Sequence, residues 1–167
     1  DFTKTHEYGA ELNYYLALVY FMKSDFENSF KGLGQLDKSK WFGQKIPYLY
    51  AQIFLKNNQT DDARRALDAV LKDSPTHIKA RVDMLEISFA GDKFEAVESN
   101  ADFIIQNKHL ASNKELARAF YYRGRVKSSK GLLEESASDL SQATKLVADE
   151  PNYLLEYYTI RSRLGDK

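Results

Sequence analysis

The sequence contains no cysteine and few of the residues that interrupt helices. A chain of 167 residues without cysteine has no disulfide framework, no thiolate nucleophile and no cysteine-ligated zinc. This composition fits the cytoplasm and leaves the periplasm open, so the compartment stays unassigned. Only three prolines and eight glycines are present, and this scarcity favours helices over a protein built from strands and turns.

The sequence also lacks long hydrophobic runs and an excess of either charge. No run of about 18 apolar residues occurs, and the amino-terminal segment DFTKTHEYG lacks the basic-then-apolar pattern of a secretion signal. The 24 lysines and arginines balance 24 acidic residues, which argues against the strongly basic surface of a nucleic-acid or membrane binder. The missing initiator methionine favours a processed product or a fragment of a longer chain.

Residues that could form a catalytic or metal site are scattered along the chain. His6, His77 and His109 lie outside any H-x-x-x-H spacing, which favours surface or helix-capping roles. Acidic pairs such as Asp61 and Asp62 begin expected helices, where the helix dipole favours negative charge. No glycine-rich stretch has the order of a phosphate-binding loop. The sequence therefore predicts no enzyme activity, no metal and no cofactor.

A polar turn followed by a small residue recurs along the chain. The small residues are Ser29, Ala63, Ala96 and Ser136, at spacings of 34, 33 and 40 residues. Two antiparallel helices approach to about 8–10 Å only where small side chains lie at their crossing point. We therefore predict that Ala96 is the small residue at which the second helix of its pair packs against the first.

The expected first helices usually carry a small or tightly packed residue upstream of the turn, as at Ala17, Ala51 and Gly124. This pattern resembles the tetratricopeptide repeat, a helix-turn-helix unit of 34 residues with small residues at positions 8 and 20. The best unit is ARAFYYRGRVKSSKGLLEESASDLSQATKL. The third unit departs most, because Met84 stands at position 8 and Asn100 at position 24.

The resemblance implies an all-α fold, a right-handed superhelix of stacked helix-turn-helix units forming one domain over residues 1–167. The expected units are about 10–43, 44–76, 77–116 and 117–150, followed by a terminal helix over 151–167. The helix after the third unit should start late, with Ser112 or Asn113 as its cap.

In the family that the chain resembles, the first helix of each unit lines a concave groove. The positions that face a ligand there correspond to Tyr14, Leu18, Phe21, Tyr48, Gln52, Arg81, Leu85, Arg118, Tyr121, Arg125 and Arg163. The early members are aromatic or aliphatic and the later ones mostly basic, so the resemblance predicts a groove of positive potential and a partner with an acidic segment. Arg123 and Lys127 fall at inward positions, and we expect their stems to pack and their charged groups to reach solvent.

The resemblance implies a protein-interaction scaffold or adaptor that binds a peptide segment of a partner in this groove. The chaperone-binding subfamily uses Lys and Asn at the positions where Tyr14 and Leu18 stand here, so that specificity is not expected. A helical-repeat nucleic-acid binder is the alternative, with arginines on phosphate and tyrosines on bases. A dimerisation or output segment of a larger bacterial signalling or assembly protein also stays open, as does homo-oligomerisation.

Overall fold

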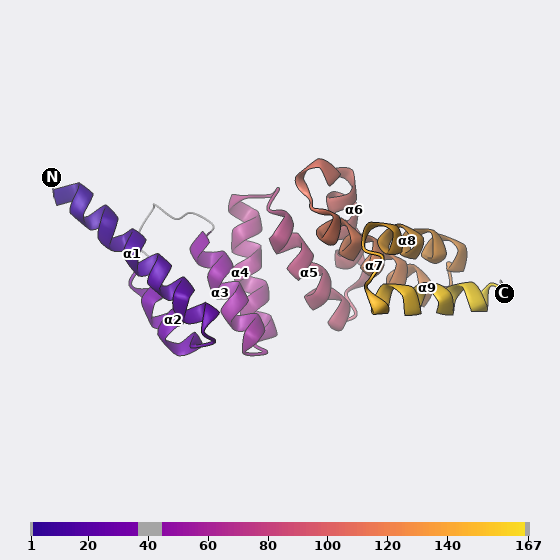
Figure 1. Ribbon diagram of the computed structural model, residues 1–167, viewed down its shortest axis with the longest axis horizontal. Helices are drawn as coiled ribbons and strands as arrows, with labels where there is room; N and C mark the ends of the chain where they lie inside the picture. Colours follow the sequence, from indigo (N-terminus) through magenta and orange to yellow (C-terminus); the bar gives the residue numbers. More distant parts are fainter. Residues whose placement is uncertain (1, 37–44, 166–167) are drawn as a thin grey trace. The chain divides into compact units, whose positions relative to one another are not determined.

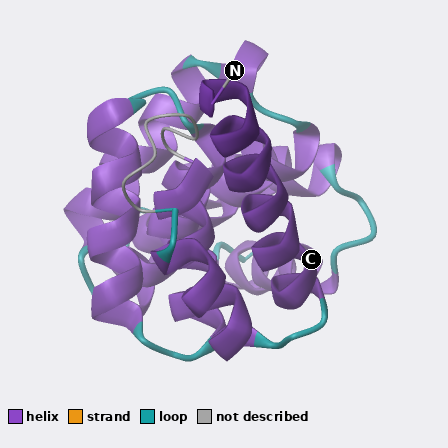
Figure 2. Ribbon diagram, turned by 90° about the vertical axis from the view of Figure 1, so that its left-hand side faces the viewer, coloured by secondary structure: helices purple, strands orange, loops and turns teal. Residues whose placement is uncertain are grey.

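The computed structural model describes residues 2–36 and 45–165, with side chains from residue 9 onward. Over these residues the chain forms only helices and loops (Figures 1 and 2). The helices are α1 (Phe2–Met22), α2 (Phe26–Gly34), α3 (Lys45–Lys56), α4 (Thr60–Asp73), α5 (Ile78–Ala90), α6 (Phe94–Gln106), the short 3-10 helix η1 (Lys108–Leu110), α7 (Asn113–Ser129), α8 (Leu133–Leu146) and α9 (Pro151–Arg163). The all-helical prediction is confirmed for the part of the chain that the structure describes.

The helices pair into hairpins within two compact units, residues 1–76 and 77–167. Unit 1 contains the hairpins α1–α2 and α3–α4, and unit 2 contains α5–α6 and α7–α8 together with α9. Each unit has a hydrophobic core of its own, centred on residues such as Leu33 and Ile53 in unit 1 and Leu85 and Val126 in unit 2. A single domain over the whole chain stays a prediction.

Every hairpin turn contains one residue in the left-handed region, which lets the chain reverse within a few residues. These residues are Ser24, Asn58, Asp92 and Gly131, with φ of 60°, 57°, 53° and 77°. They lie 34, 34 and 39 residues apart. We align the four repeats on these turn residues. The residues that correspond between repeats are then assigned from backbone conformation rather than from side-chain size.

This register corrects the third repeat by one residue. The residue five positions after the turn residue is fully buried in all four hairpins, and in the third hairpin it is Val97. Ala96 is only half-buried, so the prediction that it forms the helix crossing is wrong. Leu85 lies seven residues before the turn residue, as Ala17, Ala51 and Gly124 do in the other hairpins, and it shares a hydrophobic core with Val97. Leu85 has no exposed surface, and Met84 lies one position before it. The third hairpin therefore packs a larger pair of side chains where the others use small ones.

The α7–α8 crossing leaves little room for a side chain at its glycine. A Cβ atom added at Gly124 would lie 3.0 Å from Cγ of Leu140 and 3.3 Å from Cβ of Asp139. Contacts this short are tighter than most Cβ contacts in proteins, so a larger residue would force Leu140 and Asp139 to shift.

The start of α7 follows the prediction made from its sequence. Ser112 precedes the helix with extended backbone, and its hydroxyl oxygen accepts a hydrogen bond from the Glu115 backbone N–H. The Glu115 carboxylate accepts in return from the Ser112 backbone N–H at 2.7 Å. This reciprocal capping box fixes the first residue of α7, and with it the part of the helix that carries the site described below.

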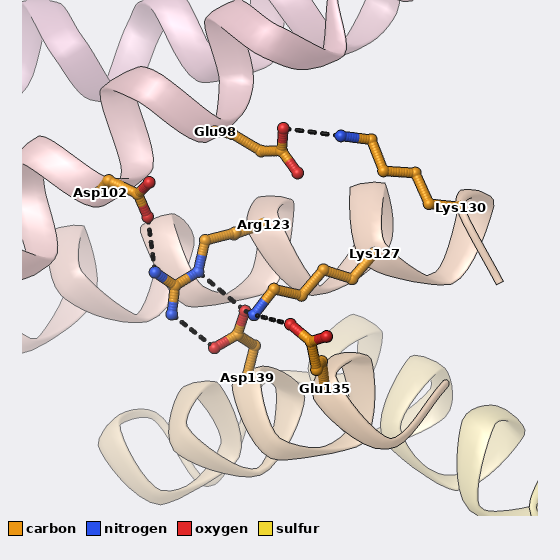
Figure 3. Close-up of polar contacts among 7 residues, drawn as sticks. All are labelled: Glu98, Asp102, Arg123, Lys127, Lys130, Glu135 and Asp139. Carbon is orange, nitrogen blue, oxygen red and sulfur yellow. Dashed lines mark hydrogen bonds and ion pairs between the residues drawn. The ribbon is translucent and has the colours of Figure 1, made fainter. Parts of the chain in front are cut away.

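A group of charged side chains joins α7 to α6 and α8, the second helices of the two hairpins of unit 2, called here the outer helices (Figure 3). Arg123 of α7 donates two hydrogen bonds to Asp139 of α8, at 2.8 and 2.7 Å, and one to Asp102 of α6, at 2.6 Å. Lys127 lies 3.0 Å from the same Asp139 carboxylate and 3.3 Å from Glu135. Burial alone would lower the pKa of Arg123, but the hydrogen bonds and charges of Asp139 and Asp102 raise it above its ordinary value.

The expectation that the charged groups of Arg123 and Lys127 reach solvent is therefore wrong. Their side chains are 20% and 18% exposed, and both cations converge on Asp139, whose side chain is 6% exposed. Asp139 is buried with two cations around it, and we name this arrangement the Asp139 network.

Replacing the glycine at the α7–α8 crossing tests the corrected register. Gly124→Leu should lower the free energy of unfolding by at least about 1–3 kcal/mol, because the added side chain meets Leu140. Ala96→Leu should change it by no more than about 0.5 kcal/mol, because Ala96 lies beside the crossing and keeps access to solvent. Urea unfolding followed by circular dichroism measures both. Equal losses in the two variants would contradict the register.

Removing the shared carboxylate tests the Asp139 network. Asp139→Ala should destabilise unit 2 by about 3 kcal/mol, since it leaves Arg123 and Lys127 half-buried without their common partner. Glu135→Ala on the same helix is the matched control, and because its side chain is 59% exposed the expected cost is under about 1 kcal/mol. A melting temperature of Asp139→Ala equal to that of the control would show that the network adds no stability.

Candidate functional site

One face of unit 2 gathers charged and aromatic side chains from its three inner helices, α5, α7 and α9. The first part, named here the tyrosine pocket, is a cavity lined by Glu86, Arg118, Tyr121, Tyr122, Glu150, Asn152 and Tyr153. The second part, named here the arginine end, comprises Phe89, Arg125, Ser128 and Arg163. Tyr121 belongs to the pocket and also lies beside Arg125, so the two parts adjoin along α7.

An ion pair crosses the tyrosine pocket. Arg118 of α7 donates a hydrogen bond to the carboxylate of Glu86 on α5. Burial lowers the pKa of Arg118, but Glu86 more than offsets this, so the pKa lies above its ordinary value. Arg118 is therefore already occupied by a carboxylate of its own chain.

Three tyrosine rings form the apolar walls of the pocket. The Tyr121 ring centroid lies 5.3 Å from that of Tyr122 and 4.7 Å from that of Tyr153. Burial is the main cause that raises the pKa of all three hydroxyls, and nearby glutamate charges raise it further. These tyrosines stay neutral near pH 7 and present aromatic surface and hydroxyl groups.

The arginine end holds a guanidinium group on an aromatic ring. The Arg125 guanidinium carbon lies 4.2 Å from the Phe89 ring centroid and 5.5 Å from that of Tyr121. Arg163 of α9 donates a hydrogen bond to the Ser128 hydroxyl at 3.1 Å. Among the described residues, no carboxylate lies within ion-pair distance of Arg125 or Arg163. Stacking on Phe89 and a hydrogen bond to the Tyr121 hydroxyl hold the Arg125 group in place, and no carboxylate of the described residues uses its remaining donors.

The charge of this face differs from the expectation of a positive groove. The corrected register places Glu86, rather than Leu85, at a ligand-facing position of α5. Glu150 lines the tyrosine pocket, and Glu156 lies close enough to Tyr121 to contribute to its raised pKa. Arg118, Arg125 and Arg163 are thus accompanied by three glutamates, and the face of unit 2 carries both charges in separate places.

Two predicted groove residues pack within the α5–α6 hairpin, Leu85 fully buried and Arg81 half-buried. The Arg81 guanidinium carbon lies 3.6 Å from the Phe103 ring centroid, and the group donates a hydrogen bond to Asn100 Oδ1 at 3.1 Å. Leu85 has no exposed surface. Leu85 therefore does not line a groove, because the third repeat was read one residue out of register, whereas the place of Arg81 in a groove stays a prediction. The other predicted residues of this unit, Arg118, Tyr121, Arg125 and Arg163, come together on its inner helices.

The predicted groove residues of unit 1 are half-buried. Tyr14, Leu18 and Phe21 pack against the core of unit 1, and burial raises the pKa of Tyr14. Tyr48 and Gln52 lie half-buried on α3. They belong to a different unit from the unit 2 face, so one groove that spans all eleven residues stays a prediction.

Sequence reasoning missed two apolar features of unit 1. An exposed stripe on α1 consists of Leu12, Tyr15, Leu16, Val19 and Met22. Its members follow the i, i+3, i+4, i+7 spacing that would have revealed it. An aromatic group formed by Phe30, Tyr50 and Phe54 lines two cavities of 630 and 520 Å³, with Phe30 and Phe54 in both.

We also searched residues 2–36 and 45–165 for metal ligands, helix-capping histidines and membrane-spanning helices. No group of three metal-ligating side chains occurs there. His77 precedes α5, and its Nδ1 accepts a hydrogen bond from the Ala80 backbone N–H at 3.1 Å, which confirms its predicted capping role. No helix in this part of the chain is long and apolar enough to cross a bilayer.

Comparison with known proteins identifies the fold. Neither a protein-family model nor a curated protein sequence matches the chain. Several solved structures resemble it. MamA (41-end) from Desulfovibrio magneticus RS-1 has 16% identity and a TM-score of 0.80, covering 94% of this chain and 86% of that one. PilF of Pseudomonas aeruginosa has 13% identity and a TM-score of 0.78, covering 94% and 69%.

A third similar structure is the first TPR of Spaghetti (RPAP3), bound to the HSP90 peptide SRMEEVD. It has 17% identity and a TM-score of 0.64, covering 74% of this chain and 94% of that one. At these identities the likeness concerns the fold. The resemblance to tetratricopeptide repeats is confirmed at that level.

Proposed function

We propose that this chain is a protein-interaction scaffold or adaptor, and that the inner helices of unit 2 bind a peptide segment of a partner protein. Two observations support the proposal. The fold is shared with the first TPR of Spaghetti (RPAP3), which was solved with the HSP90 peptide SRMEEVD, a peptide rich in acidic residues. The inner helices α5, α7 and α9 also place aromatic rings, arginines and a cavity on one face.

The arginine end carries the main argument for peptide binding. Arg125 is stacked on Phe89 and lies beside Tyr121, so little side-chain freedom remains to be lost when a ligand binds. Arginine and tyrosine are enriched among the residues that contribute most to protein interfaces. Because no described carboxylate pairs with Arg125 or Arg163, an acidic residue of the partner would form charge-assisted hydrogen bonds there.

The nucleic-acid alternative has weaker support. A protein that follows a phosphate backbone needs several cations in a continuous track. Here Arg118 is paired with Glu86, and Glu150 and Glu156 lie among the remaining arginines. The glutamates of this face would repel a continuous phosphate backbone, whereas a peptide could match both kinds of charge. A dimerisation or output role within a larger bacterial signalling or assembly protein is compatible with peptide binding.

Selection from a bead-displayed random peptide library tests the proposal. The full chain should enrich peptides that contain acidic residues, and fluorescence anisotropy then gives their affinities. Arg125→Glu should weaken the enriched peptides at least about tenfold, because losing a charge-assisted hydrogen bond costs roughly 1.5–3 kcal/mol. Lys145→Glu, an equal charge reversal at an exposed position of outer helix α8, is the matched control and should leave affinity within about twofold.

Circular dichroism melting shows whether each variant remains folded. Full peptide affinity in a folded Arg125→Glu protein would contradict binding at the arginine end. Tight and salt-sensitive binding of a single-stranded RNA oligonucleotide, together with an empty peptide selection, would favour the nucleic-acid alternative.

A further inference from the structure

We infer that the tyrosine pocket binds a basic side chain of the partner peptide, so that the bound segment carries a lysine or arginine about three residues from the acid held at the arginine end. This inference rests on the proposed peptide-binding function and adds a second, opposite charge to the segment that unit 2 recognises.

The size and walls of the pocket suit a single side chain. Its volume is 270 Å³, below the roughly 300–1,000 Å³ typical of sites for whole small molecules. Tyr121, Tyr122 and Tyr153 supply aromatic surface on its walls. The faces of such rings attract ammonium and guanidinium groups, and their apolar surface accommodates the methylene stem of lysine or arginine.

The charges of the pocket favour a cation over an anion. Two carboxylates, Glu86 and Glu150, line it with one arginine, Arg118. Arg118 is already paired with Glu86, so the two charges offset each other. Glu150 accepts a hydrogen bond from the neutral Asn152 amide at 3.1 Å, and no described cation lies within ion-pair distance of it. The uncompensated charge of the pocket is therefore negative.

An acidic side chain would meet two obstacles in the same place. It would have to displace Glu86 from Arg118, and it would lie beside the Glu150 carboxylate. A lysine or arginine meets neither obstacle, because Glu150 attracts it and the ion pair across the pocket stays intact. The tyrosine pocket and the arginine end thus select opposite charges.

The helix geometry sets the spacing of those charges on the peptide. Arg118 in the pocket and Arg125 at the arginine end lie two turns apart on α7, which corresponds to about 10 Å along the helix axis. An extended peptide covers about 3.3 Å per residue. Opposite charges about three residues apart would therefore reach both parts together.

A set of synthetic 12-residue peptides on a serine-glycine background tests the inference with the full chain. The set contains Lys-x-x-Glu, Glu-x-x-Lys, Lys-x-x-Lys, Glu-x-x-Glu and Gln-x-x-Gln, and peptides enriched from the library serve as positive controls. Chemical shifts of the ¹⁵N-labelled protein report binding to α7 and to the start of α9. At least one mixed-charge peptide should bind about fivefold or more tighter than each like-charge peptide.

Two variants separate the contributions within the pocket. Glu150→Gln should reduce the advantage of the mixed-charge peptide over Glu-x-x-Glu, because residue 150 then no longer attracts the lysine or repels an acid. Glu86→Gln frees Arg118, so it should shift the preference toward Glu-x-x-Glu. Glu134→Gln, an exposed position at the start of outer helix α8, is the matched control and should leave the ranking unchanged.

The outcomes distinguish this inference from the proposed function. If Glu-x-x-Glu binds the original protein as tightly as the mixed-charge peptides, the basic-side-chain pocket is wrong and the proposed function stands. If only the library-enriched peptides bind, this inference is likewise overturned. If the enriched peptides also fail to bind, the proposed function fails with it.

Discussion

The close contact between α7 and α8 at Gly124 determines what the rest of unit 2 can present. With no side chain at Gly124, the two helices approach until Leu140 fills the space beside the glycine. This contact fixes the rotation of α7 about its axis, because one side must face α8. Arg118 and Arg125 then lie on the side away from α8, facing α5 and α9. The candidate site is a consequence of how tightly the helix pair is packed.

The same helix shows how position separates two uses of arginine. Arg123 points to the outer helices, where Asp102 and Asp139 occupy its hydrogen-bond donors (Figure 3). Arg125, two residues later, is stacked on Phe89 with no carboxylate in ion-pair range. An arginine whose donors are taken by carboxylates of its own chain holds helices together, whereas Arg125 has donors left over that the proposed partner could use.

Much of the fold could be predicted from sequence because it depends on local signals. The scarcity of glycine and proline and the Ser112 cap each act within a few residues, and each prediction is confirmed. The register predicted for the third repeat was wrong for a physical reason. Side-chain size suggested Ala96, but the register is set by the turn residue Asp92, and Leu85 and Val97 fill the crossing with larger side chains.

The site was harder to predict than the fold because its charges pair over long sequence distances. Arg118 and Glu86 are 32 residues apart, and nothing in either local sequence announces their contact. Counting cations at expected groove positions therefore overstated the positive charge of the face. Such a count uses only the residue type. The electrostatic potential of the face also depends on which charges are neutralised by their neighbours.

A face with separated positive and negative charges can select among partners in a way that a uniformly charged face cannot. A uniform basic face attracts any acidic segment, so it speeds association but discriminates little among acidic partners. If unit 2 binds a peptide as proposed, a face with a pocket near Glu150 and a guanidinium at Arg125 would penalise a segment that places the wrong charge in either position. Because each mismatch leaves a charge unpaired or opposed, specificity comes from repulsion as well as attraction. A neutral sum of charges is therefore compatible with selective binding, since selectivity would depend on where the charges of α5, α7 and α9 lie.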